Sequence, residues 1–259
     1  MSKGLEALAE MEYPGRFIIL GRDRADKHDV VVYGMTARSE SSQARKLEMR
    51  NEVVGGAACK VVHVVETDIK KVQEGNVSLL LYPAIIIGGE ASPGIVISNG
   101  RQTPSVWDAI RDCGKNVYPP LQVLATGVKD WTYEEDTNST ARISGVIYHG
   151  AGLSIIWKDD GDKEQRRGYH EPLLRGEGSF ISTYAGPDQN PSPPFKGEPW
   201  RLALEYDDPK SLAEAVYKAI GPKDGGKDNR IAVAALFLNP APNQSGCVII
   251  NRHERRESQ

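Results

Sequence analysis

The segment from Tyr33 to Arg45, YGMTARSESSQAR, places two arginines and three serines directly after the apolar residues Val30 to Tyr33. That apolar stretch predicts a strand. Guanidinium and hydroxyl groups at a strand end are suited to hold phosphate or another small anion. The segment contains no Gly-Lys-Ser/Thr, so a P-loop is not predicted. We expect an anion site of another kind around Arg38 and Ser39.

A second polar segment, YEEDTNSTARISG, spans residues 133–145 and begins with three carboxylates, Glu134, Glu135 and Asp136. Arg142 then opens an apolar stretch. A carboxylate beside an arginine can be a general base held next to a cation. The alternative is a solvated acidic loop, which is the common fate of such runs.

A turn and a helix start follow one another in SNGRQTPSVWDAI. Asn99-Gly100 is a turn signal, and the helix start at Thr103-Pro104 has free backbone N–H groups that can receive an anion or a carboxamide oxygen. The alternative is a plain turn with Thr103 as the helix cap.

Two further polar residues are embedded in apolar runs: Tyr82 in LLLYPAIII and Arg16 in YPGRFIILG. A buried tyrosine usually finds a hydrogen-bond partner, and its role is more often structural than catalytic. Arg16 opens the first predicted strand, where it can also be an ion-pair partner or a surface residue.

The bulk composition excludes several classes of protein. The chain has 259 residues, of which 39% are hydrophobic and 26% charged, and its formal net charge is -3. It is therefore globular rather than disordered, and it lacks the basic field expected of a nucleic-acid-binding protein. The three cysteines and five histidines show no ligand spacing, so no metal site is expected.

Targeting and membrane segments are not predicted either. The N-terminal residues lack the apolar core of a signal peptide, and the longest apolar runs are too short and too interrupted to span a bilayer. We expect a cytoplasmic protein with no membrane partner.

The elements that must position these residues are mostly strands. The apolar runs are short, often β-branched and bounded by Gly, Pro, Asn or Asp, and some, such as IAVAALFL, suit strands covered on both faces. The predicted strands are 17–21, 29–38, 60–66, 78–88, 94–99, 142–149, 153–158, 178–184, 201–206, 230–238 and 247–251.

Helices are few in this pattern. Apolar spacing predicts helices over 103–114 and 208–221, and a short one in GLEALAEM. Without a regular βαβ alternation, two stacked sheets with helices outside fit better than a Rossmann or TIM architecture. We expect one domain over 1–259, with 1–12 and 252–259 as frayed tails.

Six motifs in one order carry a family resemblance: YPGRFIILG, YGMTARSESSQAR, NVSLLLYPAI, SNGRQT, YEEDTNSTARISG and SLAEAVYKAI. Together they resemble the archaeal-type IMP cyclohydrolases and their bacterial relatives, from Tyr13 to about Ile220 and more weakly to Asn251. The resemblance implies an α+β fold, the four-layer αββα sandwich of Ntn-hydrolase-like proteins, without the N-terminal nucleophile. The first predicted strand agrees, because no Ser, Thr or Cys begins it.

The resemblance also implies a reaction. The carboxamide nitrogen of 5-formamidoimidazole-4-carboxamide ribonucleotide (FAICAR) attacks the formyl carbon, and loss of water gives inosine monophosphate (IMP), in the last step of purine synthesis. No metal or cofactor is implied. The expected partner is a purine nucleotide, and we expect a homo-oligomer.

Residue roles follow from the same resemblance. Arg38 holds the phosphate or lies against the formamido group, Tyr82 donates to the developing oxyanion or the leaving hydroxyl, and Glu134 or Glu135 accepts the carboxamide proton. The choice between the two glutamates is open. The residues expected to bind substrate are Arg16, Ser39, Asn99, Gly100, Thr103, Asn138 and Arg142.

Three features depart from the family pattern. Arg101 stands where an acidic residue is expected, Ala141 where proline is expected, and the Pro-rich loop Asp188–Pro199 is additional. Arg101 in particular favours one alternative, a related enzyme acting on another purine-type nucleotide. A non-catalytic nucleotide-binding protein of the same fold is the other alternative.

Overall fold

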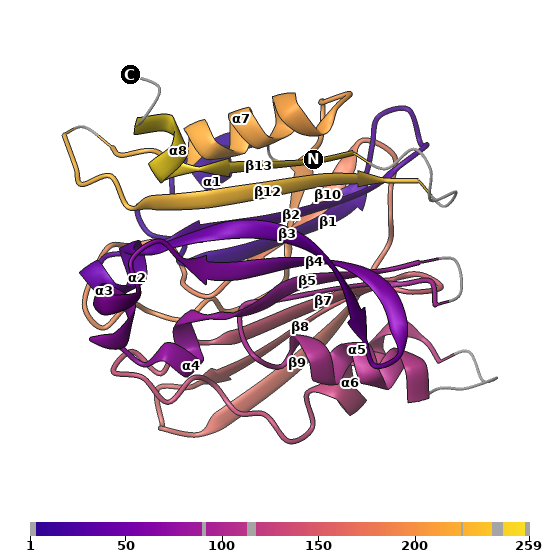
Figure 1. Cartoon of the computed structure of the whole chain (residues 1–259), viewed down its shortest axis with the longest axis horizontal. Coiled ribbons are helices and arrows are strands. Elements are labelled where there is room, and N and C mark those ends of the chain that lie inside the picture. The colour runs from indigo at the N-terminus through magenta and orange to yellow at the C-terminus, as the bar shows by residue number, and fades with distance from the viewer. Residues whose placement is uncertain (1–3, 90–91, 113–117, 224, 240–245, 257–259) are drawn as a thin grey trace.

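The computed structural model describes residues 4–89, 92–112, 118–223, 225–239 and 246–256. Within these ranges the strands pair into two antiparallel sheets, one of six strands and one of seven, which stack face to face (Figure 1).

The six-stranded sheet has the strand order β11-β10-β1-β2-β12-β13. Its central strands are buried along nearly their whole length, because their residues are apolar on both faces. One face packs against the other sheet and forms the main hydrophobic core. The strands are β1 (Arg16–Arg22), β2 (Asp29–Thr36), β10 (Glu177–Ser182), β11 (Trp200–Ala203), β12 (Arg230–Leu238) and β13 (Gly246–Asn251).

The seven-stranded sheet follows the chain order from β3 to β9 without a crossover. Its second face packs against helices and forms a separate apolar cluster around Trp107. The strands are β3 (Arg45–Val54), β4 (Ala57–Glu66), β5 (Tyr82–Gly88), β6 (Ile95–Ser98), β7 (Arg142–Ile147), β8 (Ala151–Lys158) and β9 (Glu164–Glu171).

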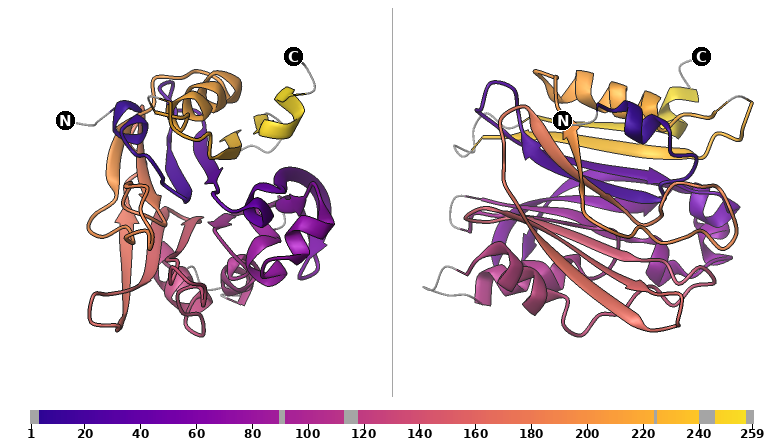
Figure 2. Two further views of the ribbon diagram at one scale, coloured as in Figure 1. Left: turned by 90° about the vertical axis from the view of Figure 1, so that its left-hand side faces the viewer. Right: turned by 180° about the vertical axis from the view of Figure 1, so that it is seen from behind.

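Helices cover the outer faces of both sheets. The helix α7 (Pro209–Ala219) packs on β12 and β13, with α1 (Glu6–Ala9) beside it, and α5 (Thr103–Asp112) and α6 (Pro120–Gly127) pack on the seven-stranded sheet. The layers therefore run helix, sheet, sheet, helix (Figures 1 and 2). The shorter helices are α2 (Glu40–Gln43), α3 (Ile69–Gln73), α4 (Val77–Leu80) and α8 (Arg252–Arg256).

The expectation of an α+β protein with two stacked sheets is confirmed, and each predicted strand has a counterpart. Two strands were missed, β3 and β9. Both carry charged residues along much of their length and stand at the edges of their sheet, so they lack the apolar pattern used to find strands.

Two boundaries differ from prediction for reasons that the structure shows, and a third cannot be compared. The predicted strand 78–88 begins only at Tyr82, because the Asn76 side chain accepts from the backbone N–H of Ser78 and starts α4 instead. Thr103 is the first residue of α5 rather than an accepting cap, since its hydroxyl donates to the carbonyl of Gly100 at 2.9 Å. The predicted helix end at Gly114 lies outside the described residues.

The described parts of the two terminal segments are folded, contrary to the prediction that they fray. Leu8 is fully buried and Met11 nearly so, because α1 packs against α7 and contributes to the main core. Residues 252–256 form α8, where Arg252 donates to the carbonyl of Asp228 at 3.0 Å.

A search of the described helices finds none that combines the length and the apolar character needed to cross a membrane.

Candidate active site

A cluster of buried polar residues lies between the two sheets at one end of the sandwich. Arg16 opens β1, Tyr82 opens β5, Arg142 opens β7, and Asn99 follows the end of β6. In antiparallel sheets the start of one strand lies beside the end of its neighbour, which brings these positions together from distant parts of the chain.

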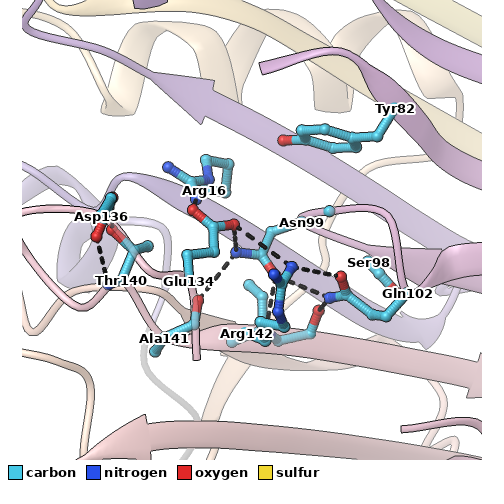
Figure 3. A network of polar contacts seen from close by, with 12 residues as sticks. Arg16, Tyr82, Ser98, Asn99, Gln102, Glu134, Asp136, Thr140, Ala141 and Arg142 are labelled. Carbon is cyan, nitrogen blue, oxygen red and sulfur yellow. Dashed lines mark hydrogen bonds and ion pairs between the residues drawn. The ribbon is translucent and has the colours of Figure 1, made fainter. Parts of the chain in front are cut away.

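Glu134 is at the centre of this cluster, with only 2% of its surface exposed. Its carboxylate accepts hydrogen bonds from Arg16 Nη2 at 2.6 Å and from Asn99 Nδ2 at 3.1 Å, and Arg142 Nη1 lies 4.0 Å away (Figure 3). Burial raises the pKa of Glu134, while the charges of Arg16 and Arg142 oppose that rise. A carboxylate in such surroundings can accept a proton from a bound substrate.

Glu135, the neighbouring residue, is exposed. The acidic segment is therefore a solvated loop at Glu135 but not at Glu134. The backbone N–H of Glu134 donates to the carbonyl of Thr140 at 2.8 Å, and this bond helps hold the carboxylate on the inner side.

A network of amide and guanidinium groups fixes the side chains that surround Glu134. Gln102 donates to Asn99 Oδ1 at 3.1 Å, and Arg142 donates to Gln102 Oε1 at 3.0 Å. Asn99 also donates to the carbonyl of Ala141 at 2.9 Å, so its amide is fixed in one orientation. A Cβ atom on Gly100 would lie 2.6 Å from Arg142 Nη1 and 2.7 Å from Gln102 Oε1, so glycine at this position leaves room for the network.

Two tyrosine hydroxyls meet beside this network. The phenols of Tyr33 and Tyr82 lie 2.8 Å apart, and both side chains are buried. Burial raises the pKa of Tyr33 well above its ordinary value. Burial lowers the pKa of Arg16, but the Glu134 carboxylate and the neighbouring Tyr82, Tyr184 and Tyr33 together outweigh this effect and raise the pKa well above the usual range. The ring of Tyr82 lies above Arg16 and Glu134 (Figure 3).

Arg38 has its hydrogen-bond partners in the additional loop and not among these residues. Its guanidinium donates to Asp188 at 2.8 Å, to the carbonyl of Gln189 at 2.9 Å and to Ser192 at 2.7 Å, and it lies 4.3 Å above the ring of Tyr13. The additional loop thus occupies the donors that were predicted to hold a phosphate or the formamido group.

The other predicted binding residues have mainly local partners. Ser39 is exposed, and its hydroxyl accepts from the backbone N–H of Ser42 as the cap of α2. Asn138 Oδ1 is a buried oxygen that has no hydrogen-bond partner among the described residues. Arg101 is exposed, between buried Gly100 and Gln102.

Sequence reasoning missed two members of the cluster, Tyr33 and Gln102, and it included Arg45 in the segment that suggested an anion site without giving it a role. Tyr33 and Arg45 are the first and last residues of the segment that suggested an anion site. Gln102 lies inside SNGRQT, beside the residues that were chosen. Gln102 would have been found among the polar neighbours of the chosen residues, whereas Tyr33 lies inside the apolar strand β2 and only the fold brings it beside Tyr82.

Alkaline pH is expected to destabilise the fold through a tyrosine at the edge of the cluster. Burial raises the pKa of Tyr184 to about 12, and its hydroxyl lies 2.6 Å from that of Thr140. An unfolded tyrosine ionises near pH 10. Between about pH 10 and 12 the folded state therefore binds more protons than the unfolded state, and stability present below pH 10 is lost as the pH rises.

Urea unfolding, followed by tryptophan fluorescence from pH 8 to 11.5, tests this. In Tyr184→Phe the fall in the free energy of unfolding over this pH range should be roughly 2 kcal/mol smaller than in wild type. The control is Tyr118→Phe, at a half-buried tyrosine, and there the fall should equal that of wild type. If the free energy of unfolding depends on pH in Tyr184→Phe as it does in wild type, Tyr184 is not the cause of the alkaline destabilisation.

Among the described residues, no three His, Cys, Asp or Glu side chains are grouped so that they could hold a metal ion. The prediction that no metal or cofactor is needed stays a prediction.

Comparison with known proteins agrees with the resemblance in the sequence. The profile of a family described as "IMP cyclohydrolase-like protein" matches residues 13–239. A protein named IMP cyclohydrolase, from Haloquadratum walsbyi (strain DSM 16790 / HBSQ001), is 28% identical over 219 residues, which cover 81% of this chain and 93% of that protein.

Proposed function

The chain belongs to the IMP cyclohydrolase-like family, and from this premise we propose that it is an IMP cyclohydrolase that closes the ring of FAICAR to give IMP and water. The carboxamide nitrogen forms a bond to the formyl carbon. The carboxamide nitrogen and the formamido nitrogen each lose one proton, and the formyl oxygen gains two and leaves as water.

The observation that carries this proposal is the burial of Glu134 between Arg16, Asn99 and Arg142. An amide nitrogen is a poor nucleophile, so the attack needs a base that is fixed in place and kept from water. We assign this role to Glu134 rather than Glu135, because only Glu134 faces the inner cluster.

The formyl oxygen needs hydrogen-bond donors as negative charge develops on it. Arg16 Nε is a buried donor without a partner among the described residues, and the linked phenols of Tyr33 and Tyr82 lie close by. We propose that Tyr82 donates to this oxygen and that Tyr33 relays the proton. The cluster is nearly closed to solvent, so a nucleotide has to displace part of its covering to reach Glu134.

The remaining expectations stay proposals. We propose that the sandwich is of the Ntn-hydrolase-like type, in which β1 begins with Arg16 and so offers no hydroxyl or thiol nucleophile. We also propose that the chain acts as a single domain, in the cytoplasm, without metal or cofactor and as a homo-oligomer. Ser39, Asn99, Gly100, Thr103, Asn138, Arg38 and Arg142 remain candidates for substrate contact.

Ring closure by the purified protein tests the proposal. IMP formation from FAICAR is followed by ultraviolet absorbance, with Tyr82→Phe as the variant. We expect kcat to fall about 100-fold, the typical effect of removing one oxyanion donor, while KM changes little. Tyr217→Phe, at a tyrosine that contacts Arg230 and Arg255 outside the cluster, is the control and should keep full activity. Absence of ring closure in the wild-type protein would refute the proposed function, and equal changes in kcat and KM would refute the role of Tyr82.

A further inference from the structure

Arg45 is a buried cation without a countercharge. It opens β3, and only 2% of its surface is exposed. Its Nε donates to the carbonyl of Ser42 at 2.7 Å, and its Nη1 donates to the carbonyl of Leu80 at 3.2 Å. Among the described residues, no carboxylate lies within ion-pair distance of this guanidinium, and these two bonds use two of its five N–H donors.

The groups around Arg45 do not neutralise it. Tyr82, Tyr33 and Tyr13 are its phenolic neighbours, and Arg16 is close enough to repel it. The Glu134 carboxylate is already bonded to Arg16. Burying a guanidinium costs several kcal/mol unless an opposite charge accompanies it, so this arrangement indicates a site that an anion completes.

The net charge of the cluster indicates which anion fits. Its buried ionic groups are the guanidiniums of Arg16, Arg45 and Arg142 and the carboxylate of Glu134, and the half-buried carboxylate of Asp136 lies close to Glu134 and Arg142, which leaves an excess of one positive charge. A phosphate monoester carries about -1.5 to -2 charges at pH 7 and offers three acceptor oxygens. A neutral group bound beside Arg45 would leave the charge of this guanidinium uncompensated.

We propose that Arg45 forms an anion subsite between the sheets that receives the monophosphate of the nucleotide, while Tyr33 and Tyr82 serve the formyl oxygen. This rests on the proposed function only for the identity of the nucleotide. Arg38, by contrast, gives three of its five N–H donors to the loop residues Asp188 to Ser192.

The test compares the binding of IMP with that of inosine, which lacks the phosphate, by isothermal titration calorimetry. Arg45→Met removes the charge and keeps the apolar stem, and Arg50→Met is the matched control at an exposed arginine of the same strand. We expect the preference of the wild-type protein for IMP over inosine to fall about tenfold to 100-fold in Arg45→Met, as for a lost charge-assisted hydrogen bond. Inosine binding and the Arg50→Met protein should be unaffected.

A second variant, Arg45→Lys, keeps the positive charge but loses the planar fork of donors. If Arg45→Met does not fold, as judged by circular dichroism, the preference should fall several-fold in Arg45→Lys. An unchanged preference, or an equal loss of IMP and inosine binding, would overturn the subsite.

Ring closure by the wild-type protein, measured in parallel, separates this inference from the proposed function. A protein that forms no IMP but loses phosphate preference in Arg45→Met retains the subsite and lacks the activity. A protein that closes the ring and keeps its phosphate preference in Arg45→Met has the activity and lacks the subsite.

Discussion

Replacing Glu134 by glutamine should lower kcat for ring closure by about 10²- to 10⁴-fold, the range expected when a positioned general base is removed. Glutamine keeps the shape of the side chain and an oxygen that can accept from Arg16 or Asn99, but it cannot take a proton. Glu135→Gln is the matched control, since this neighbouring glutamate is exposed, and its activity should stay within about twofold of wild type.

The pH dependence distinguishes a base from a residue that only shapes the site. Because burial raises the pKa of Glu134, the acidic limb of the kcat/KM profile should lie above the ordinary range of a glutamate. This limb should disappear in Glu134→Gln. A large loss of activity in Glu135→Gln, or an unchanged acidic limb in Glu134→Gln, would contradict the assignment.

Removing the cation that faces Glu134 should have the largest effect on stability. Arg16→Met is expected to lower the free energy of unfolding at pH 7 by about 3–5 kcal/mol, because it leaves a carboxylate buried without its nearest partner. In this variant the pKa of Glu134 should rise further. The folded state then binds a proton more tightly than the unfolded state, so stability declines as the pH rises through that pKa, and the deficit is smaller at pH 5 than at pH 8.

Urea unfolding of Arg16→Met at these two pH values measures the deficit. The double variant Arg16→Met/Glu134→Leu should recover much of the loss, because it removes the uncompensated charge. Arg50→Met, which breaks the exposed pair with Glu48, should produce no measurable change. An equal deficit at both pH values, without recovery in the double variant, would show that packing rather than charge explains the loss.

The positions of most strands were predictable because burial selects apolar, β-branched residues wherever a strand is covered. The strand β12 is the clearest example, since IAVAALFL lies between α7 and the second sheet. The same rule missed β3, whose residues RKLEMRNEVV alternate only weakly because the strand stands at an edge and is partly solvated. The solvated residues of an edge strand do not show the apolar pattern by which strands are recognised in a sequence.

The sequence by itself determined the family, the α+β class and the segments from which the candidate site is built. Six motifs in one order sufficed for the family, and short apolar runs of strand length sufficed for the class. Only the tertiary structure decided how these groups are used. Glu134 and Glu135 are adjacent in the chain, and the choice between them depends on Arg16, 118 positions away.

The two arginines of the opening segment show the same dependence. Arg38 is bound by a loop 150 positions away, while Arg45 points between the sheets toward the carbonyl of Leu80 and has no carboxylate partner in the described chain. Both residues are arginines that follow an alanine within the segment from Tyr33 to Arg45. Which one remains available to a ligand depends on charges and backbone groups that only the folded chain brings near them, because electrostatic partners are selected by distance in space and not along the chain.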